Sequence, residues 1–370
     1  FFFFKQKTAY EIRNCDWSSD VCSSDLHRRS EGHAFGTAER GFDRCALPHH
    51  RGRHRRQARS RRTGHAGRRY GRLLVGHKEP TTLRLIVIAL VTAAVSRDLD
   101  EDLPILGAAL ERAGTQFRIE NWHDDVDWSA FDAVFLRSPW DYHLRRDEFL
   151  EWMRRVSRTT RVFNHVDVVE WNSDKRYLAE LTAVRVPVVP TRFVSSPDAA
   201  SVRDVLDEFG NDVVVKPSVS AGSHDTLRYR DASLALDDVV RHVARIVESG
   251  AVAMVQPYEA AIDERGETGM VWLNGSLSHA FRKGAILAVA PDMANGLYAA
   301  EDIAPRSASA DEVALGEKII DFLRAKFGAA PLYARVDVIP TAGGAPQLME
   351  LELVEPSFFL AHAPSADDAV

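Results

Sequence analysis

The chain has 370 residues, of which 45% are hydrophobic and 27% are charged, a composition typical of a soluble globular protein with one or two domains. Its net charge of -6 conceals a segment rich in Arg and His, residues 27–78, so the remainder is more acidic than the total suggests. This distribution argues against nucleic-acid binding by the folded part. Its three cysteines, Cys15, Cys22 and Cys45, all precede residue 46, which excludes a disulfide framework or a cysteine zinc site afterwards and fits a cytoplasmic protein.

The first 83 residues carry no pattern of a folded domain. Residues 1–26 lack a helical or strand period and resemble translated sequencing-adapter sequence, so we treat them as an artefact. Residues 27–83 are a basic leader, which we expect to be disordered because so few apolar residues cannot offset the entropy of ordering. A basic arm that binds nucleic acid is the alternative for this segment.

Strands and helices alternate over residues 84–172, which predicts a small parallel α/β domain. The expected strands are residues 85–95, 117–122, 133–137 and 161–164, with helices after residue 102 and over residues 149–156. The apolar run 85–95 also suits a signal peptide, but the amphipathic helix after it favours a buried strand. Residues 138–142 follow a strand end, and are either a substrate loop or a loop fixed by packed aromatic rings. The domain lacks a GxGxxG dinucleotide motif.

Two lysines in the middle of the chain stand beside polar segments. Lys175 precedes a predicted helix over residues 176–182, where a lone lysine is usually solvated. Lys216 ends a buried-type strand, and the Ser/Gly loop after it offers backbone amides that can hold phosphate. Further on, residues 252–259 are expected to be a strand that runs into a polar hinge. Residues 269–283 are expected to be a hairpin around Asn274-Gly275, and residues 311–327 an amphipathic helix.

Residues 333–360 place acidic residues on two neighbouring strands joined by a turn at residues 341–346. Because side chains alternate along a strand, Arg335 and Asp337 share one face, and so do Glu350 and Glu352. Burying like charges together is costly, and a divalent cation such as Mg²⁺ removes that cost. The alternative is a solvated sheet face whose acidic residues point to water.

The order of these motifs resembles the ATP-grasp superfamily, in its glutathione-synthetase-like branch, from about residue 84 to the C-terminus. Within the branch the chain is most similar to the cyclo-ligases of cycloserine biosynthesis, which close O-ureidoserine. The resemblance implies an α/β and α+β architecture, with a pre-ATP-grasp domain over residues 84–172 and a two-lobed ATP-grasp domain over residues 173–370. The family's usual final helix is missing from the sequence, so we expect the C-terminal end to be truncated.

The resemblance also implies the cofactors and the site. ATP would bind with Mg²⁺, as two ions that Mn²⁺ can replace. Arg282 and Arg335 would neutralise the transferring phosphoryl group, and the metal ligands would be Asp337, Glu350 and Glu352. The implied ATP contacts are Lys175, Lys216, Ser220, Gly222, Ser223, Gln256, Tyr258, Glu259 and Glu267. Two positions depart from the family pattern: Glu352 stands where Asn is frequent, and Arg185 where Gly often precedes Val-Pro.

The implied function is a carbon–nitrogen ligase, a cyclo-ligase among the options, which activates an amino-acid-like carboxylate as an acyl phosphate for attack by an amine-type nitrogen. Such an enzyme acts on small molecules, without a nucleic-acid or membrane partner, and a homo-oligomer is compatible with it. The alternatives are a phosphotransferase on the same fold, which makes a stable phosphorylated product, and an ATP-binding module without chemistry.

Overall fold

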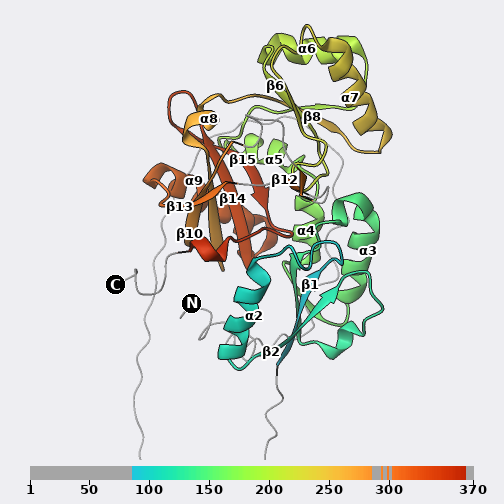
Figure 1. The fold of residues 1–370 in the computed structure, drawn as a ribbon, viewed down its shortest axis with the longest axis vertical. Coiled ribbons are helices and arrows are strands. Elements are labelled where there is room, and N and C mark those ends of the chain that lie inside the picture. Colours follow the sequence, from blue (N-terminus) through green and yellow to red (C-terminus); the bar gives the residue numbers. More distant parts are fainter. Residues whose placement is uncertain (1–85, 286–292, 295–297, 300–301, 364–370) are drawn as a thin grey trace, which may run out of the picture. The chain divides into compact units, whose positions relative to one another are not determined.

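The computed structural model describes residues 86–285, 293–294, 298–299 and 302–363 (Figure 1). The chain divides into two units, Phe1–Leu83 and Arg84–Val370, and all described residues belong to the second. The predictions for residues 1–83 and for the C-terminal end lie outside the described residues. The fold of the described part is mixed α/β, with one parallel sheet and further antiparallel sheets. Within these ranges no helix combines the length and the apolar character needed to cross a bilayer.

The first sheet is parallel and has the strand order β2-β1-β3-β4. Its elements are β1 (Val87–Thr92), α2 (Asp102–Arg112), β2 (Gln116–Asn121), β3 (Ala133–Ser138), α3 (Arg146–Val156), β4 (Arg161–Phe163) and α4 (Val166–Asn172). Leu90 shares a core with Leu110 of α2, whereas Val91 shares one with Phe149 of α3. Figure 1 shows α2 and α3 on either side of the sheet. Because both faces are covered, β1 is apolar from Val87 to Val91, and the strand predicted in this run is confirmed.

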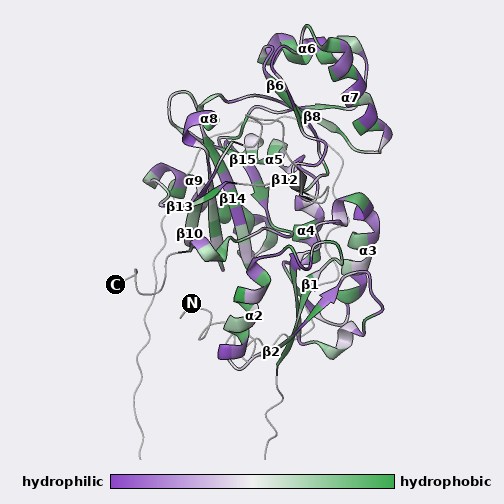
Figure 2. Cartoon of the chain, in the orientation of Figure 1, coloured by the Kyte–Doolittle hydropathy of each residue, from purple (hydrophilic) through white to green (hydrophobic). Residues whose placement is uncertain are grey.

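The second sheet is antiparallel and has the order β5-β8-β6-β7. Its elements are β5 (Arg192–Val194), α6 (Ala199–Phe209), β6 (Val213–Pro217), β7 (Leu227–Tyr229), α7 (Leu236–Glu248) and β8 (Ala253–Pro257), preceded by α5 (Tyr177–Ala183). In α7, Val239, Val243 and Ile246 are buried at helical spacing, and they share a core with Val213 and Val215 of β6. Figure 2 shows both polar and apolar residues along α6 and α7.

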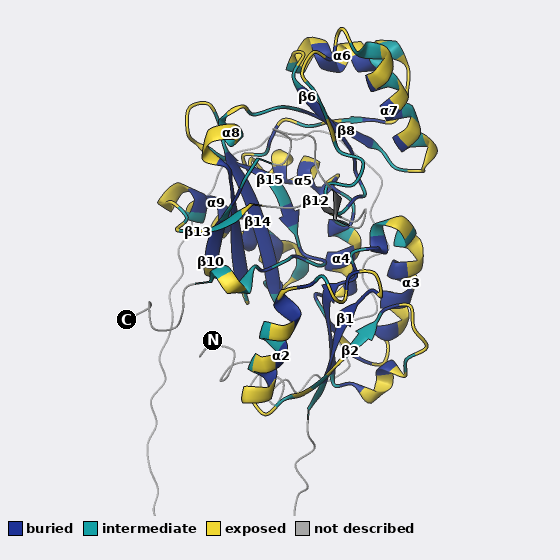
Figure 3. Cartoon of the chain, viewed as in Figure 1, coloured by how far each residue is buried: buried dark blue, intermediate teal, exposed yellow. Residues whose placement is uncertain are grey.

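The third sheet is antiparallel and has the order β13-β10-β9-β14-β15. Its elements are β9 (Glu267–Leu273), β10 (Ser276–Lys283), β13 (Ile303–Arg306), α9 (Ala310–Phe327), β14 (Tyr333–Pro340) and β15 (Pro346–Glu352). The remaining short elements are α8 (Ala261–Arg265), β11 (Met293–Ala294) and β12 (Tyr298–Ala299). Val336 and Val338 of β14 pack with Ile319 and Leu323 of α9, and these strands are buried along most of their length (Figure 3).

The parallel sheet is joined to the third sheet by a buried asparagine. The side-chain amide of Asn164 donates to the carbonyl oxygens of Tyr333, at 2.9 Å, and Leu353, at 2.8 Å. Its oxygen accepts from the backbone N–H of Leu332 at 2.8 Å. Three bonds from one 2% exposed side chain fix the start of β14 and the end of β15 against the first sheet.

Close packing between α9 and the third sheet gives a test of the core. Gly316 lies in α9 against Trp272, and a Cβ atom at this position would stand 2.4 Å from Cζ2 of that buried ring. Gly316→Ala should therefore lower the free energy of unfolding by about 1–3 kcal/mol, measured by chemical denaturation. At an exposed position in a helix the same substitution stabilises by about 1 kcal/mol. A loss of unfolding free energy would therefore indicate the close contact between Gly316 and Trp272.

Gly343 supplies the matched control, because the nearest atom to an added Cβ is Thr341 Oγ1 at 3.8 Å. Gly343→Ala should change the free energy of unfolding by less than about 1 kcal/mol. Equal losses in the two variants would contradict the packing described for α9.

Candidate active site

One cavity of about 660 Å³ gathers residues from the second and third sheets and from the helices and loops around the first sheet. The predicted site residues that line it are Lys175, Lys216, Ser220, Gly222, Ser223, Gln256, Tyr258, Glu259, Glu267, Arg335, Glu350 and Glu352. Asp337 lies directly behind this wall, 1% exposed and bonded to Arg335. The sequence therefore predicted residues that the fold brings together, although their roles remain predictions.

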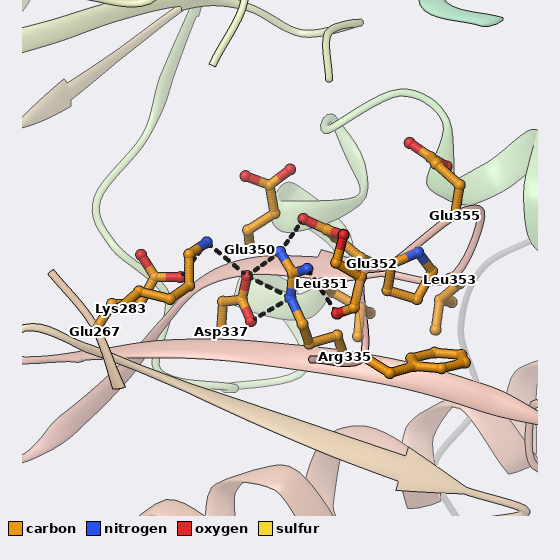
Figure 4. Close-up of polar contacts among 12 residues, drawn as sticks. Glu267, Lys283, Arg335, Asp337, Glu350, Leu351, Glu352, Leu353 and Glu355 are labelled. Atoms are coloured by element: carbon orange, nitrogen blue, oxygen red, sulfur yellow. Dashed lines mark hydrogen bonds and ion pairs between the residues drawn. The ribbon is translucent and has the colours of Figure 1, made fainter. Parts of the chain in front are cut away.

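A buried arginine stands at the centre of the charged wall (Figure 4). Arg335 donates from Nε and Nη2 to the carboxylate of Asp337, at 2.9 and 2.8 Å, and it also pairs with Glu352. Its Nη1 donates to the carbonyl oxygen of Ser357 at 3.1 Å. Burial acts to raise the pKa of Asp337, but the charges of Arg335 and Lys283 outweigh it and leave the pKa below its ordinary value.

Two lysines approach the remaining carboxylate of the strand pair. Lys175 Nζ lies 3.2 Å from Glu350 Oε1 and donates to the carbonyl oxygen of Ser220 at 2.6 Å. Lys216 is 8% exposed, and burial lowers its pKa. Glu350 is held below its ordinary pKa by Lys175 and Lys216, against the opposing effect of burial. Two ammonium groups thus converge where the Ser/Gly loop leaves β6.

The loop after β6 adopts an unusual backbone. Gly222, Ser223 and Asp225 have φ values of 58°, 62° and 52°, in the left-handed region. Only glycine enters this region without strain, so the two non-glycine residues indicate a loop fixed by its surroundings. The ring of His224 lies 5.2 Å from that of His143, which belongs to the loop after β3. Backbone amides in such a loop can face an anion.

The acidic side of the cavity carries more negative charge than its cations balance. Burial, together with Asp337 and Glu350, raises the pKa of Glu352 to about 7 despite the opposing charge of Arg335. Burial and then Glu352 raise the pKa of Glu355 well above its ordinary value. Carboxylate oxygens in surplus suit a hard divalent cation, so the chemistry of this donor set fits Mg²⁺. In the described ranges, no three His, Cys, Asp or Glu side chains are already arranged as a metal centre.

The structure separates Arg282 from the other predicted residues. Arg282 in β10 lies opposite Thr268 in β9. The Thr268 hydroxyl donates to Glu312 of α9, so these two residues lie on the sheet face that α9 covers. The next residue, Lys283, lines the cavity and lies 3.1 Å from Glu267 and 3.6 Å from Asp337. Counted from the turn at Asn274-Gly275, strand alternation would place Arg282 opposite Glu267, and the register shift between Leu277 and His279 places Lys283 there instead.

Residues outside the predicted set also line the cavity. Trp140 and Tyr142, in the loop after β3, belong to its wall, so this loop both packs aromatic rings and faces the site. Glu355 and Ser357 follow β15 and complete the same wall. Glu355 could not be predicted from strand alternation, because β15 ends at Glu352.

Comparisons with known proteins identify relatives of the whole described fold. A family described as the N-terminal domain of the D-cycloserine synthetase DcsG matches residues 88–164. The chain is 40% identical over 281 residues to the cycloserine biosynthesis protein DcsG of Streptomyces lavendulae, covering 74% of this chain and 93% of that protein. The crystal structure of D-cycloserine synthetase DcsG matches with 38% identity and a TM-score of 0.69, over 76% of this chain and 95% of that one.

More distant solved structures share the fold. A D-alanine–D-alanine ligase from Bacillus anthracis matches with 16% identity and a TM-score of 0.55, over 77% of this chain and 92% of that one. A RimK-domain ATP-grasp protein from Sphaerobacter thermophilus matches with 18% identity and a TM-score of 0.52, over 75% of this chain and 94% of that one. These likenesses confirm the predicted ATP-grasp fold.

The buried imidazole beside the loop after β6 predicts a pH dependence of stability. Burial, and then His224, lower the pKa of His143 to about 4 from 6.5. Between pH 6.5 and 4 the His143 side chain is therefore protonated in the unfolded chain and neutral in the folded chain. The free energy of unfolding falls as the pH is lowered through this range. His143→Gln should reduce this fall, measured as the free energy of unfolding at pH 7 and pH 5.

The same substitution at the exposed His165 is the matched control. It should reproduce the pH dependence of the wild-type protein. The interpretation of His143 fails if the two variants give the same profile.

Proposed function

This chain belongs to the family of the cycloserine biosynthesis protein DcsG, and from this premise we propose that it is an ATP-dependent ligase of the ATP-grasp fold that joins a carboxylate to an amine-type nitrogen. Its substrate is amino-acid-like, and ring closure within one molecule is the form of the reaction that the relative's name supports. The observation that carries the proposal is the convergence of Lys175, Lys216 and Arg335 with three carboxylates on one cavity wall.

The reaction has two transfers. The substrate carboxylate attacks the γ-phosphorus of ATP, and the bond between that phosphorus and the oxygen bridging it to the β-phosphate breaks. The products of this step are an acyl phosphate and ADP. The nitrogen then attacks the acyl carbon, its proton is lost, and the carbon–oxygen bond breaks to release inorganic phosphate. Both steps depend on positioning and on neutralising charge that spreads over phosphoryl oxygens.

Each group of cavity residues has a part in this scheme. Lys175 and Lys216 hold the ATP phosphates as point charges, and the amides of residues 218–224 lie over the γ-phosphate. Arg335 stabilises the transferring phosphoryl group with a planar donor fork. Gln256, Tyr258 and Glu259 form the adenine and ribose hinge, with the carboxylate on the ribose hydroxyls.

Magnesium is the metal that this donor set would hold. The ligands would be Asp337, Glu350 and Glu352, with two ions bound and Mn²⁺ able to replace them. When bound, the ions neutralise the phosphate charge of the nucleotide. Burial, and then Asp337 and Glu350, raise the pKa of Glu352, and a bound cation would offset both effects. A cytoplasmic location with ATP as the energy source completes the proposal.

Removal of single carboxylates tests the metal and phosphate site. Asp337→Asn and Glu350→Gln should each lower Mg²⁺- and ATP-dependent phosphate release by about 10²–10³-fold, since each removes a charge that positions the transferring group. The assay screens amino-acid-like acids, including O-ureidoserine, using protein that begins near residue 84, and measures free phosphate.

Glu317→Gln on the exposed side of α9 is the control and should keep wild-type turnover. Wild-type turnover in both site variants would disprove the metal assignment. A stable phosphorylated product in place of free phosphate would show a phosphotransferase instead.

A further inference from the structure

Glu355 differs from the neighbouring carboxylates because it has no cationic partner among the described residues. Asp337 and Glu352 pair with Arg335, and Glu350 pairs with Lys175. The side-chain oxygens of Glu355 make no hydrogen bond or ion pair with another described residue, yet the residue lines the cavity. Figure 4 shows its carboxylate apart from Arg335 and the carboxylates that Arg335 binds.

The backbone that carries Glu355 is firmly held. Its carbonyl oxygen accepts from Trp140 Nε1 at 3.4 Å, and the carbonyl of Pro356 accepts from Arg137 at 3.3 Å. The carbonyl of Ser357 accepts from Arg335 at 3.1 Å. Two donors from β3 and the loop after it, and one from β14, thus fix the backbone at the carboxylate and directly after it.

Tyr142 is 4% exposed and lines the same cavity as this carboxylate. Burial, and then the charge of Glu355, raise the pKa of Tyr142. A carboxylate and a hydroxyl that line one cavity can together bind a small cation such as an ammonium group: the carboxylate forms the ion pair, and the hydroxyl oxygen accepts a hydrogen bond.

The chemistry of an amino acid places its ammonium group beside the reacting carboxylate, with one carbon between them. The ammonium site must therefore lie next to the place where the carboxylate is phosphorylated. Resting on the proposed ligase function, we propose that Glu355, with the hydroxyl of Tyr142, binds the ammonium group of the substrate and selects amino acids over acids that lack the amine. Burial, and then the charge of Glu352, raise the pKa of Glu355, and a bound ammonium would favour the ionised carboxylate against both effects.

The test compares O-ureidoserine with the analogue that carries a hydroxyl in place of the amine. Binding is measured by calorimetry with a non-hydrolysable ATP analogue present, so that it does not depend on turnover. The wild-type protein should bind the amine on the order of 10²-fold more tightly than the hydroxyl analogue. Equal binding of the two probes would overturn the proposal without any variant.

Glu355→Gln should remove most of this discrimination and raise KM for the amino acid on the order of 10²-fold, with ATP affinity unchanged. Glu355→Asp keeps the charge and should retain part of the preference, which also covers the case in which the glutamine variant does not fold. A lowered kcat with unchanged KM and unchanged discrimination would show a proton-transfer role and overturn the proposal.

Glu101→Gln is the matched control, because this exposed glutamate lines the same cavity and loses the same charge. It should keep the preference for the amine, and loss of the preference there would assign the ammonium site to Glu101 instead. If phosphate release is absent with every acid while the amine preference is measured, the proposed ligase function fails and the Glu355 site stands.

Discussion

The architecture of the site depends on one buried ion pair, between Arg335 and Asp337. The guanidinium donates from Nε and Nη2 to Asp337, from Nη2 also to Glu352, and from Nη1 to the Ser357 carbonyl. Its rigid fork matches carboxylate geometry, whereas a lysine would supply a single point charge. Removing one partner of such a pair would leave a buried charge uncompensated, at a cost of about 3–5 kcal/mol. The pair therefore fixes β14, β15 and the segment beyond β15 together.

This pair also determines where the remaining charges must lie. Because Arg335 already pairs with Asp337 and Glu352, the charge of Glu350 is balanced by Lys175 and Lys216, and that of Glu267 by Lys283. The lysines thus come from three different elements and converge on one strand pair. The negative surplus remains on the far side, around Glu352 and Glu355, which separates a phosphate-attracting region from a cation-attracting one within a single cavity.

Strand alternation was enough to predict the charged strand pair, because regular strands repeat every two residues. It placed Arg335, Asp337 and Glu350 correctly relative to each other, and the structure brings them to one wall. The choice of Arg282 over Lys283 came from the family resemblance instead. A shift of register between Leu277 and His279 in β10 obscures the count along that strand, so only pairing with β9 shows which residue faces the cavity.

Other features needed the folded chain. Helices α6 and α7 were not predicted from the sequence, although Asp198 accepts from the Ser201 N–H and so caps α6. Arg185, noted as a departure from a frequent glycine, has a φ of 61°, the left-handed conformation for which glycine is favoured.

The part that the N-terminal sheet plays in the site follows from a second buried ion pair. Arg137 at the end of β3 lies between Asp100 and Asp102, at 3.4 and 3.3 Å, and its guanidinium stacks on the ring of Phe358 at 4.3 Å. Asp102 in turn accepts from the backbone N–H groups of residues 358–360. A carboxylate that holds three amides orders the segment directly after Glu355. The small parallel sheet therefore shapes the Glu355 side of the cavity through backbone contacts, whereas β6, β14 and β15 carry Lys216, Arg335 and Glu350 on the other side.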